Sequence, residues 1–299
     1  MDFLLDFLQT SIDGVMFGST YALMAVGFTL IWGLMRILNL AHGETVMVGM
    51  FVGMVLTKHA GLPLPIAFLG SVVGGMGVGL VAERVCYRPL RKAHELVPMI
   101  ATLGLWMFLE ELFTHTYFYL YFHDYVRFPS PSALMGVDIG PFRLRVDYLI
   151  TLGVATVLVF LLYAVVYRTK MGLALRMIAE SHDIAYLMGV NVPAVLTLAF
   201  CIASGFGGAA GFLLGMSTSM ANPYSGTLAT VKGLFVMILG GSGSTAGAIA
   251  GGLLLGFLEL QSAYLISFAY RDAVAMGLLF LILVFRPQGL FGARGTERV

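Results

Sequence analysis

The chain has 299 residues, of which 59% are hydrophobic and only 11% charged, and its formal net charge is +1. Soluble domains carry about 25% charged residues, and a mean hydropathy of +0.91 implies more apolar surface than a soluble globule can hide. These values exclude a disordered chain, a disulfide scaffold and most soluble enzyme folds, and the charge gives no field that attracts nucleic acid. They indicate a polytopic membrane protein.

Apolar runs suited to a bilayer recur along the whole chain. A helix needs about 20 residues to cross a hydrocarbon core of about 30 Å. In chain order the runs are 11–34, a short one at 44–57, 63–85, 98–121, 148–167, 193–216, a long stretch at 228–265 and a last one at 272–285. They lack the alternation of a membrane barrel, so we expect an all-α helical bundle without strands.

Two interruptions decide how many times the chain crosses. One lies near 36–44, and the other is the glycine- and serine-rich segment near 240–246. The short runs beside them are either crossings of their own or re-entrant pieces covered by protein. The sequence therefore predicts a single transmembrane domain over 1–299 with about eight or nine crossings and broken or re-entrant segments at these two places.

Basic residues set the expected orientation, because cytoplasmic loops are enriched in lysine and arginine. Eleven of them fall on one side: Arg36, Arg84, Arg88, Arg91, Lys92, Arg168, Lys170, Arg176, Arg286, Arg294 and Arg298. Five fall on the other: Lys58, Arg127, Arg143, Arg145 and Arg271. We expect the richer side to be cytoplasmic, with the N-terminus and the loop around Pro131 outside.

The first interruption contains the candidate pathway or gating residues Asn39, His42, Gly43 and Glu44. Polar groups at membrane depth usually face the bundle interior and serve function, and broken segments in transporters often mark the pathway. The alternative is a helix cap at the membrane surface, in which Asn39 and Glu44 satisfy a helix end. Two further charges in apolar runs, Lys232 and Glu259, are interpreted as a structural pair.

Motifs of enzyme chemistry are missing from the sequence. It has no Gly-x-x-x-x-Gly-Lys-Ser/Thr phosphate loop and no His-Glu-x-x-His zinc motif. Ser181, His182 and Asp183 are adjacent, so on a helix they point about 100° apart and do not form a catalytic relay. We therefore expect no catalytic residue, metal or cofactor, and a chain that is not itself an enzyme.

The loop at about 168–192 is the longest one predicted to be cytoplasmic. It resembles one or two short amphipathic helices, with Leu173, Met177, Ile184 and Met188 along one side. Gly189 is a candidate C-terminal cap, Ser181 or Asp183 a candidate N-cap, and Asn191 a cap for the next run. Such a stripe either docks a partner, packs on the membrane domain or lies in the lipid interface.

This loop closely resembles the coupling loop of bacterial ABC importer permeases for branched-chain amino acids. The matching positions are Gly172, Arg176, Ala179, Glu180, Leu187, Gly189, Val190 and Asn191, whereas Met177 replaces the usual alanine. The segments Asn39–Glu44, Glu83–Arg91, Asn222-Pro223 and Gly240–Ser244 are similar to other motifs of the family. The likeness is to the high-affinity leucine–isoleucine–valine H-type permease and covers almost the whole chain.

The resemblance implies the rest of an importer in the bacterial cytoplasmic (inner) membrane. A second related permease would pair with this chain, two ATPase subunits would bind the coupling loop, and a soluble binding protein would deliver substrate. Related systems import urea, short amides or other amino acids, so the substrate stays open at this point. An ion- or proton-coupled secondary transporter, which would work from this chain alone, is the remaining alternative.

Overall fold

The computed structural model describes residues 2–91, 93–121, 126–129 and 135–291. Long helices dominate it, because a backbone in lipid must satisfy its hydrogen bonds internally. Seven helices in this part of the chain are long and apolar enough to cross a membrane. They are α1 (Asp2–Met35), α3 (Leu64–Ala82), α4 (Leu96–Tyr121), α5 (Val146–Arg168), α8 (Val192–Thr218), α10 (Thr245–Leu265) and α11 (Arg271–Phe285), the last of which reaches 18 residues together with the 3-10 turn before it.

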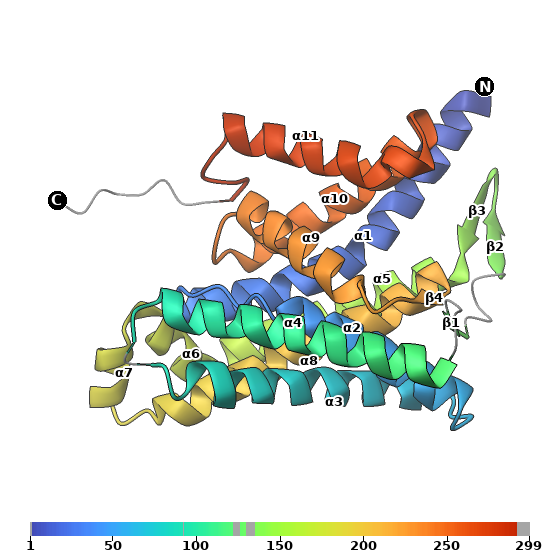
Figure 1. The fold of residues 1–299 in the computed structure, drawn as a ribbon. Coiled ribbons are helices and arrows are strands. Elements are labelled where there is room, and N and C mark those ends of the chain that lie inside the picture. Colours follow the sequence, from blue (N-terminus) through green and yellow to red (C-terminus); the bar gives the residue numbers. More distant parts are fainter. Residues whose placement is uncertain (1, 92, 122–125, 130–134, 292–299) are drawn as a thin grey trace.

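Two further helices complete the bundle in the described part of the chain. They are α2 (His42–Lys58, 17 residues) and α9 (Ser225–Gly240, 16 residues). α2 begins within the last residues of the first predicted interruption, and α9 ends at the start of the second. The helical bundle and both breaks are confirmed, and the described ranges contain nine bundle helices (Figure 1).

Short elements lie at the two ends of the bundle (Figure 1). At one end α6 (Lys170–Glu180) and α7 (His182–Leu187) join α5 to α8. At the other end the described residues form four strands: β1 (Val126–Arg127) pairs with β4 (Met220–Ala221), and β2 (Gly136–Ile139) pairs with β3 (Phe142–Arg145), both antiparallel. A π-helical turn (Glu83–Tyr87) continues α3, and a 3-10 turn (Phe268–Tyr270) precedes α11.

We expected no strands. The segments that could cross a membrane are indeed helical in the described residues, but the loops between them contain short strands. The four strands are two to four residues long. In the hairpin, Gly140 has a left-handed φ of 62° that permits the tight turn between β2 and β3. Segments outside the helices still need partners for their backbone groups, and short strand pairing supplies them.

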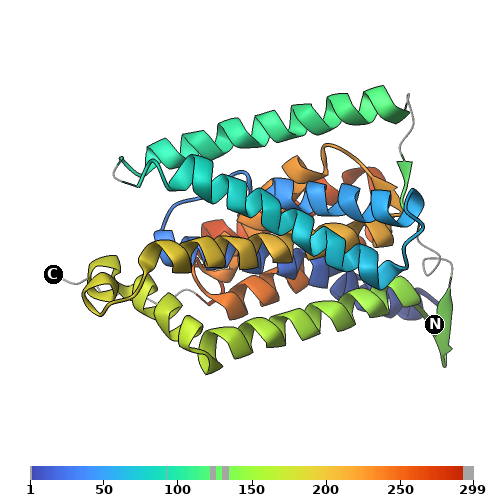
Figure 2. The same ribbon diagram turned by 90° about the horizontal axis from the view of Figure 1, so that it is seen from below.

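Glycine lets the bundle helices approach closely, as is common between membrane helices. Gly18 on α1 faces Gly252 and Gly256 on α10, and a Cβ atom at any of the three would lie closer than 3.0 Å to the backbone of the other helix. α1 runs obliquely through the molecule (Figures 1 and 2). It thereby joins the layer of α9, α10 and α11 to the layer of α2, α3, α4, α5 and α8.

The two groups of basic residues lie at opposite ends of the bundle. The turn after α3, the α5–α6 junction and the C-terminal end of α11 share the end that holds α7, whereas the β2–β3 hairpin marks the other (Figure 1). Lys92, Arg294 and Arg298 lie outside the described residues. We call the α7 end the basic end and the other the hairpin end.

Thiol labelling in intact cells tests which end faces the cytoplasm. A membrane-impermeant reagent should modify a cysteine placed at Asp138 on the hairpin but not one at Arg91 or Ser181 until the cells are opened. The native thiols, Cys86 and Cys201, are both free and are replaced first. Labelling of Ser181→Cys in intact cells would overturn the orientation; Pro131, the external position expected above, lies outside the described residues.

Candidate functional site

The break after α1 lies inside the protein. Arg36 takes a left-handed φ of 55° and ends α1, and α2 does not begin until His42. The side chains of Asn39, His42 and Glu44 are 3%, 0% and 0% exposed. Protein thus encloses these polar side chains, whereas Arg36 at the start of the break is exposed.

Three neighbouring elements hold the backbone of the break. The Leu40 amide donates to the Thr102 hydroxyl on α4 over 3.2 Å. The Tyr87 hydroxyl, in the π-helical turn, donates to the Leu38 carbonyl over 3.1 Å, and the Thr230 hydroxyl on α9 lies 3.3 Å from the Leu40 carbonyl. The break is therefore a fixed junction between α1, α2, α4 and α9.

His42 lies at the centre of this junction. Its ring stands edge-on to Phe28 of α1, with 4.5 Å between the centroids. Among the described residues its ring nitrogens have no well-aligned hydrogen-bond partner, and the Met24 carbonyl is a weak acceptor nearby. A buried polar ring without a strong partner is uncommon, which favours a role beyond packing.

Glu44 is buried in the first turn of α2 and faces Gly226 of α9, where an added Cβ would lie closer than 3.0 Å to its carboxylate. Neither carboxylate oxygen has a hydrogen-bond partner in the described part of the chain. Glu110 of α4, the carboxylate that acts on it electrostatically, accepts hydrogen bonds from Trp106 and Thr227. An unpaired buried carboxylate is costly, so this position is not explained by stability.

The capping hydrogen bonds of the alternative interpretation are not formed. The residue at the N-cap of α2 is Ala41, and no side chain makes a capping bond there. The Asn39 side-chain oxygen and both Glu44 oxygens lack partners among the described residues. Asn39 and Glu44 therefore do not bond the end of the helix, although Glu44 does lie in its first turn.

Gly43 sets the distance between α2 and α9. A Cβ atom at this position would lie closer than 3.0 Å to the Thr230 hydroxyl and the Gly226 carbonyl oxygen. Because the carbonyl belongs to the backbone, a larger residue would have to move a helix. Close packing of α2 against α9 is thus the reason for glycine at this position.

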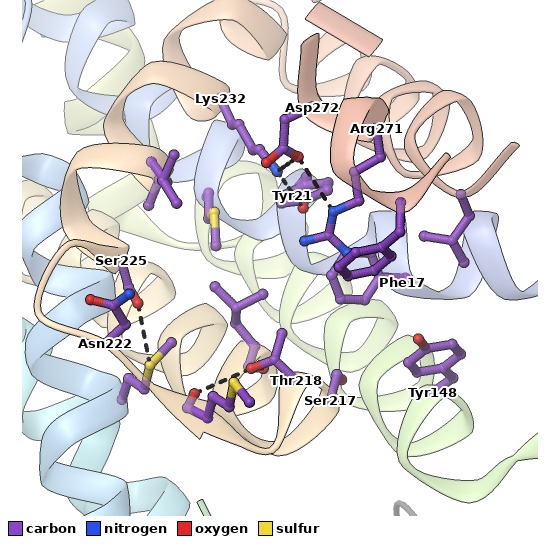
Figure 3. Close-up of a pocket in the computed structure, with 18 of the residues that line it drawn as sticks. Phe17, Tyr21, Tyr148, Ser217, Thr218, Asn222, Ser225, Lys232, Arg271 and Asp272 are labelled. Carbon is purple, nitrogen blue, oxygen red and sulfur yellow. Dashed lines mark hydrogen bonds and ion pairs between the residues drawn. The ribbon is translucent and has the colours of Figure 1, made fainter. Parts of the chain in front are cut away.

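A cavity of about 530 Å³ opens between the bundle helices toward the hairpin end. Its walls come from α1, α2, α5, α8, α9, α10 and α11. In Figure 3, Lys232, Tyr21, Asp272 and Arg271 gather on one side, and Ser217, Thr218 and Asn222 lie on the opposite side. The cavity was not predicted from the sequence, because its walls come from segments up to about 250 residues apart, from Phe17 to Asp272.

Lys232 is the centre of the charged side of this cavity. Its ammonium lies 3.1 Å from both oxygens of Glu259, 2.9 Å from Asp272 and 3.0 Å from the Tyr21 hydroxyl. The Arg271 guanidinium adds a second cation 3.3 Å from Glu259. The predicted pairing of Lys232 with Glu259 is confirmed, whereas the roles of Tyr21, Asp272 and Arg271 in the cluster were not predicted from the sequence.

Replacing Lys232 by methionine should destabilise the protein by about 3–5 kcal/mol, because it removes the main partner of the fully buried Glu259 carboxylate. Thermal unfolding of the purified chain in detergent measures this. The double variant Lys232→Met/Glu259→Met should recover most of the loss, because it removes both charges. Equal unfolding temperatures for Lys232→Met and wild type would contradict the structural role of the pair.

The loop at 168–192 folds into α6 and α7. The Thr169 hydroxyl caps α6 by accepting the Gly172 amide over 3.0 Å, and a Cβ at Gly172 would lie closer than 3.0 Å to the carbonyls at the end of α5. The Ser181 hydroxyl caps α7 and the Asn191 side chain caps α8, as predicted. Gly189, with a left-handed φ of 80°, follows the end of α7 as expected.

The two faces of this loop differ from the predicted stripe. Leu175, Ile178 and Ala185 are buried against α1 and α8. In the stripe, Leu173, Ile184 and Met188 are instead 52%, 57% and 70% exposed, and Met177 packs at the edge of the buried cluster. The spacing of apolar residues does not show which face of a helix packs against the protein when two of its faces are apolar.

The outward face of α7 is strongly apolar. Besides Ile184 and Met188, Tyr186 is 73% and Leu187 83% exposed. We call these four residues the α7 patch. Ala179 and Glu180 are exposed nearby, as is Arg176, whose guanidinium lies 5.3 Å from the centre of the Tyr167 ring. The loop is thus anchored on one side and open to a partner on the other.

A helical bundle with enclosed polar breaks and a charged cavity between its helices is the architecture of a membrane transport protein. Comparison with known proteins makes this more specific. The family described as branched-chain amino acid transport system / permease component matches residues 11–283. The chain belongs to this family, and it is a multi-pass protein of the inner membrane.

Curated relatives share nearly the whole chain. It is 36% identical to the high-affinity branched-chain amino acid transport system permease protein BraD of Pseudomonas aeruginosa and 34% identical to LivH of Escherichia coli, a protein of the same description, each over 98% of both chains. It is also 25% identical to the fructose import permease protein FrcC of Rhizobium meliloti, over 94% of this chain and 76% of that protein.

Proposed function

We propose that this chain is the transmembrane permease subunit of an ABC importer and forms a translocation pathway for branched-chain amino acids. One observation carries the proposal: a member of a branched-chain amino acid permease family presents an exposed apolar patch on a loop that is packed against the bundle at its basic end. ATP would be hydrolysed on separate subunits, because the sequence has no phosphate loop of its own. The whole chain then acts as one transmembrane domain, with 168–192 as its coupling loop.

The α7 patch is the proposed docking site of an ATPase subunit. Exposed apolar clusters of this kind usually mark interfaces, and α7 projects beyond the ends of the bundle helices (Figure 1). The Thr169 and Ser181 caps and the buried Leu175 and Ile178 fix the loop to the membrane domain. A push on α7 would therefore be transmitted to α5 and α8. Gly172, Arg176, Ala179, Glu180 and Gly189 are the proposed coupling residues.

The break at Asn39–Glu44 is the proposed gating element. It joins α1, α2, α4 and α9, and it contains buried polar groups without partners among the described residues. Such groups are satisfied if a second arrangement of the helices, or a passing substrate, supplies hydrogen bonds. This supports a role for His42 and Glu44 in switching access to the pathway.

The further partners follow from the family. A second related permease would pair with this chain in the membrane, and a soluble binding protein would deliver substrate at the hairpin end. The relatives BraD and LivH are named for branched-chain amino acid transport, whereas FrcC is named for fructose import. Substrates other than leucine, isoleucine and valine therefore belong in any test.

Uptake of radiolabelled leucine, isoleucine and valine by cells with and without this gene tests the substrate class. Loss of the gene should remove high-affinity uptake of all three, and an excess of urea, acetamide or fructose should not compete in wild-type cells. Unchanged leucine uptake in the deletion strain, with loss of urea or fructose uptake, would instead favour a related importer with a different substrate.

A further inference from the structure

We propose that the cavity at the hairpin end binds the head group of a zwitterionic α-amino acid, with the carboxylate on the terminal nitrogens of Arg271 and the ammonium on the outer oxygen of Asp272. This rests on the proposed function and adds to it a site and a mode of recognition. Both residues begin α11, and both line the cavity next to Lys232 (Figure 3).

The bonds within the charged cluster show which groups remain available. Glu259 is fully buried and engaged by Lys232 and Arg271, and the Lys232 ammonium is surrounded by Glu259, Asp272 and Tyr21. Arg271 uses Nε for its ion pairs with Glu259 and Asp272, and its terminal nitrogens have no such partner in the described residues. Asp272 uses Oδ1, and its carboxylate is 45% exposed.

The second arginine of the cavity is already engaged. Arg145 binds Asp147 through two nitrogens, over 3.1 and 2.7 Å, and also donates to the Tyr148 hydroxyl and the Ser217 carbonyl. Arg145 therefore has few N–H groups left to bind the carboxylate of a ligand. Among the described residues that line the cavity, Arg271 is therefore the arginine whose two terminal nitrogens are available to bind a carboxylate.

The charge balance of the cluster favours a zwitterion over an ion. Lys232 and Arg271 carry two positive charges, and Glu259 and Asp272 carry two negative ones, so the cluster is neutral. A ligand with a net charge gains no attraction from it, whereas adjacent positive and negative groups match a carboxylate and an ammonium on one carbon.

The remaining wall suits an aliphatic side chain. Phe17, Met24, Met50, Leu214, Leu228 and Phe268 supply apolar surface around the cavity. The volume of about 530 Å³ lies in the range of small-molecule sites, and a few polar groups on a largely apolar wall give such sites their orientation and specificity. A branched-chain amino acid would then place its head group at Arg271 and Asp272 and its side chain along these residues.

Protection of a cysteine from modification tests the site directly. Thr218 lines the cavity opposite the charged cluster and is exposed (Figure 3). The variant Thr218→Cys, in the full chain without native cysteines, is assembled in lipid nanodiscs and treated with a charged thiol reagent. L-leucine should slow modification, whereas 4-methylpentanoate, which lacks the ammonium, and 3-methylbutylamine, which lacks the carboxylate, should not at the same concentration.

Head-group variants and a matched control complete the experiment. Arg271→Lys keeps the positive charge beside Glu259 but loses the two terminal nitrogens of the guanidinium. Asp272→Asn keeps the shape of the side chain but loses its negative charge. Each should raise the leucine concentration needed for protection by about tenfold or more, as expected for a lost charge-assisted hydrogen bond. Arg143→Lys, on the exposed hairpin, should not change it. Without leucine, equal modification rates show that the cavity is intact in every variant.

Each outcome separates this site from the proposed function. Leucine uptake by the assembled wild-type transporter without protection of Thr218→Cys overturns the site and leaves the function standing. Protection that 4-methylpentanoate reproduces, or that survives in Arg271→Lys and Asp272→Asn, also overturns it. Protection by leucine that both head-group variants lose supports the site, even if the chain proves to transport another substrate.

Discussion

Replacing Leu187 by aspartate should abolish ATP-driven transport while leaving the membrane domain folded. The side chain is 83% exposed, so the change costs the isolated chain little. In the proposed complex it lies in the apolar α7 patch, where a buried charge without a partner is strongly unfavourable. Losing one central contact of an interface typically costs about 2 kcal/mol or more, which is about 30-fold in affinity.

The measurement is co-purification of the ATPase subunits with the tagged chain, together with the stimulation of ATP hydrolysis by substrate. Val137→Asp is the matched control, because Val137 is 46% exposed on the hairpin at the opposite end. Arg176→Ala and Glu180→Ala should weaken the same two readouts to a smaller extent. Normal ATPase binding and stimulation in Leu187→Asp would show that α7 is not the docking surface.

Replacing Gly43 by valine should remove substrate uptake per assembled complex. The new side chain would collide with the Thr230 hydroxyl and the Gly226 carbonyl, so α2 and α9 could no longer approach at the break. Overpacking a well-packed contact costs about 1–3 kcal/mol, and here the strain falls on the proposed gate. Uptake is normalised to the amount of complex recovered from the membrane.

Two further variants make the result specific. Gly104→Val on α4 adds the same side chain where no atom lies within 4 Å, and it should transport normally. His42→Ala removes the ring beside Phe28 without adding bulk, and it should lower uptake while the complex still assembles. If both Gly43→Val and His42→Ala transport normally per complex, the break is not part of the gate.

Much of the fold follows from the sequence because lipid allows few alternatives. The predicted run 148–167 became α5 (Val146–Arg168), and 193–216 became α8 (Val192–Thr218). Apolar runs of this length must be helical, and local capping signals such as Asn191 then set their ends. The breaks were visible for the same reason, because glycines and polar residues interrupt continuous apolar stretches.

The parts that were not predicted depend on contacts between distant segments. The hairpin formed in a loop whose period-2 pattern is too short to recognise. Arg271 and Asp272 come close to Lys232 because α9, α10 and α11 pack together, which their place at the start of an apolar run does not indicate. The inward face of α6 and α7 was likewise decided by neighbouring α1 and α8.

Leucine uptake by reconstituted liposomes tests the central claim most directly. The purified chain is inserted alone, or together with its partner permease and ATPase subunits, and the binding protein is added outside with ATP inside. The proposed function predicts uptake that requires the whole assembly and ATP hydrolysis and that is insensitive to collapse of proton and sodium gradients. Leucine uptake by this chain alone, driven by an ion gradient without ATP, would contradict it.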